Sequence, residues 1–148
     1  MLIYTFQTYP WLSQLKTEHP NLFVFKKLRA ELPSLFNRIS QENPQYIIGI
    51  AKPIHNYSQI ETMAVNRFNQ TKKVSPKGKD GYSLFIPPIL PSGIVISPSP
   101  TDSFCNWTMY KIAEQLEKEN LSAHLIFLHA DIRGAKTLVA NIAKYPGY

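Results

Sequence analysis

The segment Tyr46-Ile47-Ile48-Gly49-Ile50-Ala51 is an almost continuous apolar run of strand length, rich in β-branched isoleucine. A strand with one solvated face alternates apolar and polar residues, but this run leaves no strongly polar residue for either face. Strands of this kind are typically covered on both faces, as in parallel sheets flanked by helices. The run therefore predicts a central strand over 46–51 in an α/β fold.

Further strands and helices alternate along the chain. Strands are expected over 2–6, 22–25, 94–96 and 125–128, with extended segments over 60–68 and 82–86. Helices are expected over 104–119 and 134–144, and a short helix is expected to start at Pro33 and end before Pro44. This alternation favours a three-layer α/β/α sandwich with a mainly parallel, mixed central sheet. With 148 residues, we expect a single domain over 1–148.

The bulk composition limits the class of protein. A single cysteine, Cys105, cannot form an internal disulfide, and an unpaired thiol suits a reducing compartment. No apolar run approaches the ~20 residues of a membrane span, and the amino terminus lacks the pattern of a secretory signal. We therefore expect a cytoplasmic protein that does not bind a membrane. The net charge of +6 is thinly spread, so a basic nucleic-acid-binding module is a less favoured function.

Two residues with reactive side chains follow two of the predicted strands. Cys105 stands in the first turn of the helix after strand 94–96, and His129 ends the next apolar strand. We expect strands 94–96 and 125–128 to be parallel neighbours joined by that helix. Both residues would then lie at the carboxyl edge of the sheet, where ligands bind in open α/β folds.

A cysteine next to a histidine base can act as a nucleophile. The helix start, capped by Asp102 or Ser103, favours negative charge and is expected to lower the pKa of the Cys105 thiol. His129 would accept the thiol proton and become an imidazolium beside the thiolate. Such a base needs an orienting acceptor. Three carboxylates are candidates for that role: Glu61, Asp102 and Asp131.

Four segments add a family resemblance. Residues 60–66 read I-E-T-M-A-V-N, which is similar to a glutamate segment of the type I-x-x-E-x-x-A-x-N, and residues 44–50 read P-x-x-I-I-G-I, like the strand before it. Cys105-Asn106 is similar to the C-N of a nucleophile motif, and residues 127–129 are similar to an F-I-H motif. In this order, the segments resemble pyroglutamyl peptidase I, also called pyrrolidone carboxylate peptidase.

The resemblance implies a cysteine peptidase that removes an amino-terminal pyroglutamate, or a related N-blocking acyl group, from peptides. Cys105 would attack the acyl carbonyl, His129 would take the thiol proton and later protonate the leaving amine, and Glu61 would hold the imidazole. Backbone N–H groups at the start of the Cys105 helix would be the oxyanion donors. The resemblance implies no metal and no organic cofactor. The partner would be a small peptide or N-blocked amide, and a homo-oligomer is left open.

The expected substrate pocket departs from the family pattern. The family's loop G-F-x-P-F-G-G corresponds to residues 5–11, where Phe6 is kept, Tyr9 takes the place of the second aromatic residue and the glycines are absent. Ser103 stands where the family has an aromatic residue two places before the cysteine, and Phe104 follows it. We therefore expect substrate binding at Phe6, Tyr9, Ser103 and Phe104, with altered acceptance. A catalytically inactive relative that acts as a binding or assembly protein is the alternative.

Overall fold

The middle layer of the protein is a six-stranded sheet with strand order β2-β1-β3-β8-β4-β7, seen in a computed structural model that describes residues 1–146. In chain order these strands are β1 (Leu2–Phe6), β2 (Phe23–Phe25), β3 (Tyr46–Ala51), β4 (Ser58–Ile60), β7 (Ile94–Ile96) and β8 (His124–His129). The pairs β1–β2, β1–β3, β3–β8 and β4–β7 are parallel, and β4–β8 is antiparallel. The sheet is therefore mixed and mainly parallel, as predicted.

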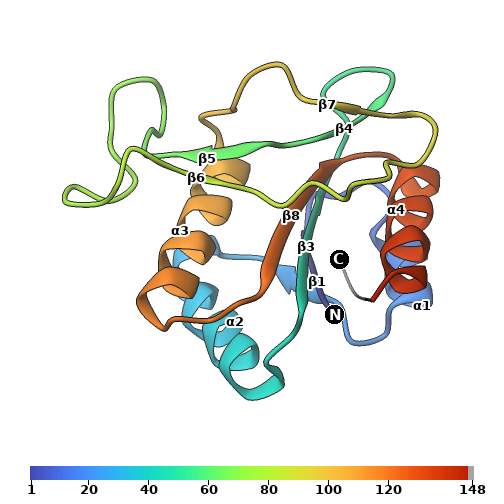
Figure 1. The fold of residues 1–148 in the computed structure, drawn as a ribbon, viewed down its shortest axis with the longest axis horizontal. Coiled ribbons are helices and arrows are strands. Elements are labelled where there is room, and N and C mark those ends of the chain that lie inside the picture. Colours follow the sequence, from blue (N-terminus) through green and yellow to red (C-terminus); the bar gives the residue numbers. More distant parts are fainter. Residues whose placement is uncertain (147–148) are drawn as a thin grey trace.

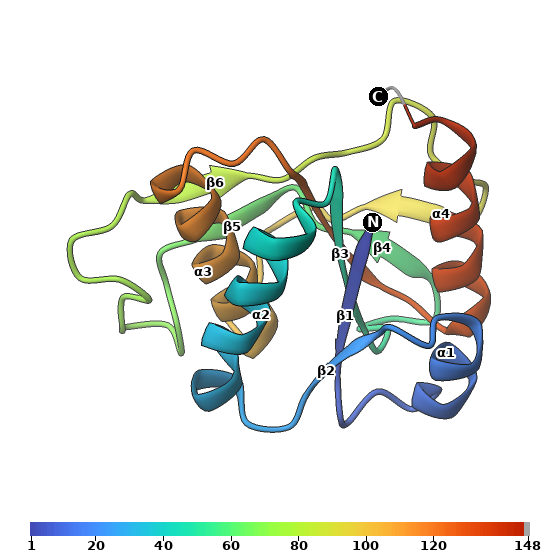
Figure 2. The same ribbon diagram turned by 90° about the horizontal axis from the view of Figure 1, so that it is seen from below.

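Helices cover both faces of this sheet, which confirms the three-layer α/β/α architecture (Figures 1 and 2). The helices α2 (Leu28–Glu42) and α3 (Phe104–Lys118) lie on one face, and α1 (Leu12–Glu18) and α4 (Ile132–Lys144) lie on the other. A hairpin of β5 (Met63–Val65) and β6 (Gly81–Ser83) forms a second, two-stranded sheet that packs on α3.

The central strand β3 shows why the apolar run is needed. Ile47 and Ala51 belong to the core between the sheet and α2–α3, while Ile48 and Ile50 belong to the core on the α1–α4 side. Gly49 faces the rings of Tyr4 and Phe127, and a Cβ at this position would overlap both rings. The run is buried on both faces, as the sequence predicts.

The helices differ from expectation in two places. The helix expected from Pro33 begins earlier, at Leu28, and Pro33 lies inside it. The carboxylate of Glu31 accepts hydrogen bonds from the backbone N–H groups of Lys26 and Lys27, both at 2.6 Å, and so secures an earlier start. The helix α1 at Leu12–Glu18 was not predicted at all.

The prediction that strands 94–96 and 125–128 are parallel neighbours is wrong. The strand β4 lies between β7 and β8, parallel to β7 and antiparallel to β8. β7 therefore runs against the direction of β8, and residues 97–103 must bring the chain back to the start of α3. Figure 1 shows β4 and β7 near one end of β3 and β8.

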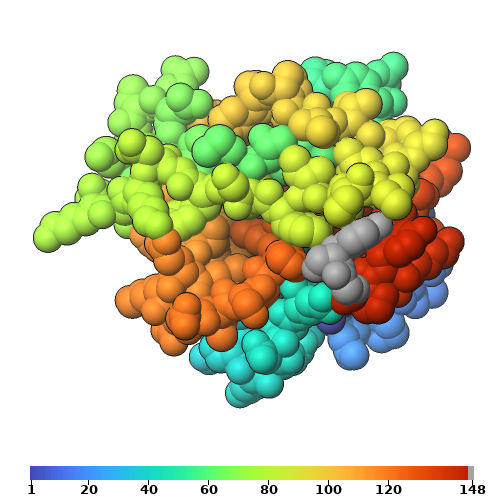
Figure 3. All heavy atoms as spheres, viewed as in Figure 1, coloured from blue at the N-terminus to red at the C-terminus, as the bar shows by residue number. Residues whose placement is uncertain are grey.

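The lysine-rich loop between β5 and β6 projects from the body of the molecule (Figure 3), yet polar contacts anchor it. The Asn66 amide accepts from the Ser75 N–H and donates to the carbonyls of Ser75 and Gly78. Asp102 accepts from the Gln70 N–H through its side chain and from the Asn69 N–H through its carbonyl. These contacts tie the loop to the segment that leads into α3.

Candidate functional site

Glu61 and His129 meet because of the antiparallel pairing of β4 with the end of β8. Gln59 lies opposite His129, and Ile60 lies opposite Leu128. Ile60 and Leu128 both pack into the core on the α4 side. Because side chains alternate along a strand, Gln59, Glu61 and His129 face the other side, toward α3.

The contacts of His129 engage both ring nitrogens. Nε2 lies 3.3 Å from Glu61 Oε1, and both side chains are buried. Nδ1 lies 3.1 Å from the backbone carbonyl oxygen of Lys52. The ring is therefore held between a carboxylate and a carbonyl at the end of the central strands.

Of the three carboxylates that sequence spacing left open, Glu61 is the one beside His129. Asp131 caps α4 and accepts a hydrogen bond from the Gly134 N–H at 2.9 Å. Asp102 accepts from the Gln70 N–H at 3.0 Å. Both carboxylates therefore accept from backbone N–H groups away from His129.

Unsatisfied polar atoms gather around this pair. Within residues 1–146, six buried side-chain nitrogen and oxygen atoms make no hydrogen bond, and four of them are Gln59 Oε1, both Glu61 oxygens and His129 Nε2. Glu61 Oε1 and His129 Nε2 approach each other without the alignment of a hydrogen bond. Buried polar atoms are nearly always paired in proteins, so this concentration of unpaired atoms makes the Glu61–His129 pair the candidate functional site.

Cys105 lies in the first turn of α3, as expected, and Ser103 is the residue that caps the helix. The Ser103 hydroxyl oxygen accepts from the Cys105 N–H at 3.3 Å. Cys105 is buried in the same core as Phe6 and Phe127, on the α3 side of the sheet. The nucleophile candidate and the Glu61–His129 pair therefore face the same layer of the protein.

The expected lowering of the thiol pKa is wrong for this conformation. Burial raises the pKa of Cys105 to about 12, and the charge of Glu61 adds to the increase. The Ser103 hydroxyl, the helix backbone and the Lys52 ammonium oppose it but do not outweigh burial. Within the described residues, no hydrogen bond joins the Cys105 thiol to His129 or Glu61, so the thiol is protonated and unpaired with its base.

The four expected substrate-binding residues separate into two places. Phe6 and Phe104 pack edge to face, with ring centroids 4.9 Å apart, and both line a hollow of about 190 Å³. Ser103 adjoins them as the cap of α3. Tyr9 packs on the α4 side of the sheet and donates its hydroxyl to the Ala130 carbonyl. The Tyr9 side chain therefore lies on the opposite side of the sheet from the Phe6–Phe104 hollow.

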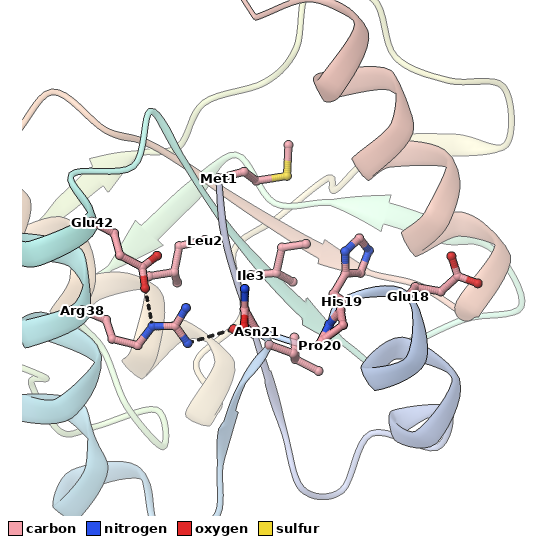
Figure 4. Close-up of a pocket in the computed structure, with 10 residues that line it drawn as sticks. Met1, Leu2, Ile3, Glu18, His19, Pro20, Asn21, Arg38 and Glu42 are labelled. Carbon is pink, nitrogen blue, oxygen red and sulfur yellow. Dashed lines mark hydrogen bonds and ion pairs between the residues drawn. The ribbon is translucent and has the colours of Figure 1, made fainter.

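Larger hollows lie elsewhere. One of about 600 Å³ lies at the amino end of β1, with Arg38 and Glu42 on one wall and His19 on another (Figure 4). Since Phe6, the last residue of β1, marks the edge near Cys105, this hollow lies at the opposite edge. We therefore do not assign the candidate chemistry to it.

Three contributions to the site were not predicted from the sequence: Gln59, the Lys52 backbone and the role of Asn106. Gln59 stands two places before Glu61, so strand alternation alone could have placed it on the same face. The Lys52 contact is made by its backbone, which no residue pattern reports. Asn106 is buried, accepts from the Val65 N–H and donates to the carbonyls of Val65 and Arg67. Asn106 thereby holds β5 against α3 through hydrogen bonds.

The fold and the site together define an α/β/α protein with a buried glutamate–histidine pair facing the same side of the sheet as a helix-start cysteine. Within residues 1–146, no helix is both long and apolar enough to cross a membrane. The same residues hold no cluster of three or more His, Cys, Asp or Glu side chains suited to a metal ion.

Solved pyrrolidone carboxyl peptidases share this fold. The enzyme from Thermococcus litoralis matches with a TM-score of 0.68 and 17% identity, over 86% of this chain and 74% of that one. The enzyme from Pyrococcus furiosus matches with a TM-score of 0.68 and 16% identity, over 97% and 85%. Pyroglutamyl peptidase I from Bacillus amyloliquefaciens matches with a TM-score of 0.66 and 17% identity, over 86% and 79%.

Comparison at the sequence level gives no match, either to protein families or to curated proteins. The chain therefore has the pyrrolidone carboxyl peptidase fold across most of its length, at an identity that establishes the fold alone.

Proposed function

We propose that the protein is a cysteine hydrolase that removes pyroglutamate, or a related N-blocking acyl group, from the amino terminus of small peptides. The observation that carries this proposal is the buried Glu61–His129 pair with its unsatisfied atoms, facing the same layer as Cys105. Buried ionisable groups are costly unless they are paired and hydrogen-bonded. A catalytic role gives a reason to retain them.

In the proposed reaction, Cys105 Sγ attacks the acyl carbonyl carbon while His129 takes the thiol proton. Glu61 holds the ring and stabilises the imidazolium that forms. The carbonyl π bond opens to an oxyanion, which the backbone N–H groups at the start of α3 are placed to receive. Collapse of this intermediate breaks the C–N bond, and His129 gives its proton to the leaving amine. Water then hydrolyses the thioester and regenerates the thiol.

The hollow beside the nucleophile suits a compact acyl group. Its walls include Phe6, Phe25 and Phe104, and Lys26 lies at its rim. Phe104 precedes Cys105 in the first turn of α3, so the proposal places the acyl group of the substrate in this hollow, with its carbonyl carbon directed to the thiol. Three aromatic walls without the family's glycine-rich loop favour acceptance of N-blocking groups beyond pyroglutamate.

Hydrolysis of a fluorogenic pyroglutamyl amide, together with a panel of other N-acyl amides, tests the proposal. We expect the wild-type protein to hydrolyse at least one of them and Cys105→Ala to lose that activity. Ser34→Ala, an exposed change on α2, is the control that keeps full activity. Hydrolysis by Cys105→Ala at the wild-type rate would overturn the proposal.

A non-catalytic relative that binds N-blocked peptides or an assembly partner is the second candidate. The observation that favours it is the protonated, buried thiol without a hydrogen bond to His129, whose two nitrogens already face other acceptors. This function predicts that the panel binds without turnover. Calorimetric binding of an intact N-acyl amide, with no product after prolonged incubation, would favour it over the hydrolase.

A further inference from the structure

Lys52 is joined to the candidate site through its backbone. It follows directly after β3, whose last residue, Ala51, is paired with His129. Its carbonyl oxygen lies 3.1 Å from His129 Nδ1. Pro53 follows, and a residue before proline is confined to extended conformations, so the direction of the Lys52 carbonyl is restricted before the ring meets it.

The two acceptors around His129 determine where its protons lie. A carbonyl oxygen only accepts hydrogen bonds, so the Lys52 contact is favourable when Nδ1 carries a proton. An ionised Glu61 also only accepts, so the contact at Nε2 is favourable when that nitrogen carries one as well. Both contacts are satisfied together by the imidazolium, which is the form of His129 that follows proton transfer from Cys105.

The second contribution of Lys52 is the positive charge of its side chain, which acts on the Cys105 thiol. The side chain is exposed, and within residues 1–146 its ammonium forms no ion pair. Its positive charge lowers the pKa of the Cys105 thiol, against the increase caused by burial and by Glu61. An unpaired cation near a thiol favours the thiolate.

We propose that Lys52 is a positioning residue for the nucleophile, whose carbonyl holds the His129 imidazolium and whose ammonium supports the Cys105 thiolate. This inference rests on the proposed function. In the proposed transfer the proton passes from Sγ to the neutral His129 ring, and the sulfur keeps the electron pair of the S–H bond. In the imidazolium that results, Nδ1–H donates to the Lys52 carbonyl and Nε2–H faces Glu61. The transfer leaves the total charge of the site unchanged.

The rate of Cys105 alkylation by iodoacetamide, measured between about pH 8 and 10, tests this role without any peptide substrate. Lys52→Met keeps the side-chain stem and removes the charge, so we expect alkylation to slow about threefold or more at each pH, since half a pKa unit is a threefold change in thiolate. Lys52→Arg restores the charge and should alkylate like the wild type. Lys16→Met removes an exposed lysine on α1 and serves as the matched control.

Pro53→Ala tests the carbonyl separately, because it frees the Lys52 backbone but keeps the ammonium. We expect slower alkylation and an altered ¹⁵N signal of the His129 ring in this variant. Wild-type alkylation profiles in both Lys52→Met and Pro53→Ala would overturn the role of Lys52. Slower alkylation in a protein that hydrolyses none of the N-acyl amides would uphold it and reject only the proposed hydrolase activity.

Discussion

Asn106 and Glu61 are both polar, completely buried and located around α3, yet their surroundings differ. Asn106 makes three hydrogen bonds to the backbone around β5, whereas neither oxygen of Glu61 makes one. Glu61 has only the approach of His129. The comparison separates a buried polar residue that stabilises the architecture from one to which the proposed function assigns a chemical role.

Glu61→Gln should have the largest effect, and that effect should be on hydrolytic activity and not on stability. The amide cannot stabilise an imidazolium as a carboxylate does, so we expect hydrolysis to fall about a hundredfold or more. The free energy of unfolding should change by only about 1 kcal/mol, because the substitution keeps the shape and removes a buried charge without hydrogen bonds. Steady-state kinetics and urea unfolding check the two parts. A loss of several kcal/mol with unchanged turnover would assign Glu61 to structure.

Asn106→Ala should instead lower the free energy of unfolding. The change leaves the buried backbone groups of Val65 and Arg67 without partners, so we expect a loss of about 3 kcal/mol in the free energy of unfolding. Asn141→Ala is the control, since Asn141 Oδ1 already lacks a hydrogen bond. Its loss should be about 1 kcal/mol or less. Equal losses in the two variants would remove the distinction between them.

Cys105 gives the stability a pH dependence with a definite sign. Its pKa is about 12 in the folded protein and near ~8.5 in an unfolded chain, so above pH ~8.5 the unfolded state binds fewer protons than the folded one. Stability from the protonated thiol is therefore present at neutral pH and lost as the pH rises. Between about pH 8.5 and 10, the wild type should lose about 1–2 kcal/mol more than Cys105→Ala. Parallel stability curves for the two proteins would refute the raised pKa.

Phe104→Ala and Tyr9→Phe test which of the predicted substrate-binding residues contacts substrate. Their effects should be the smallest of the four predictions. Phe104 lines the hollow beside Cys105, so its truncation should raise KM severalfold. Tyr9 donates to the Ala130 carbonyl on the other side of the sheet, so losing its hydroxyl should cost about 1 kcal/mol of stability and leave KM unchanged. A higher KM in Tyr9→Phe would place Tyr9 back among the substrate-binding residues.

Sequence patterns predicted the features that depend on local periodicity. The run at 46–51 identified β3, and the apolar stripe after Cys105 identified α3, because burial on one or both faces leaves a direct imprint on residue order. The insertion of β4 between β8 and β7 left no such imprint. Strand order depends on long-range pairing, and a three-residue strand carries too little pattern to specify its neighbours.

The candidate site shows the same division. The proximity of Glu61 and His129 agrees with the family resemblance, and the cap at Ser103 follows from helix-start chemistry. The pKa of Cys105 could not be predicted, because burial by distant core residues outweighs the local effect of the helix start. The Lys52 carbonyl was also invisible, since any residue type presents the same backbone group.

The central claim, that Cys105 is the nucleophile of a hydrolase, is tested most directly by trapping its acyl intermediate. The protein is mixed rapidly with an activated pyroglutamyl ester, quenched in acid and measured by intact mass and peptide mapping. We predict one added acyl group, located on Cys105, formed far faster than on a free thiol and absent in Cys105→Ala. Hydrolysis without any acyl group on Cys105, or acylation no faster than that of N-acetylcysteine, would contradict the account.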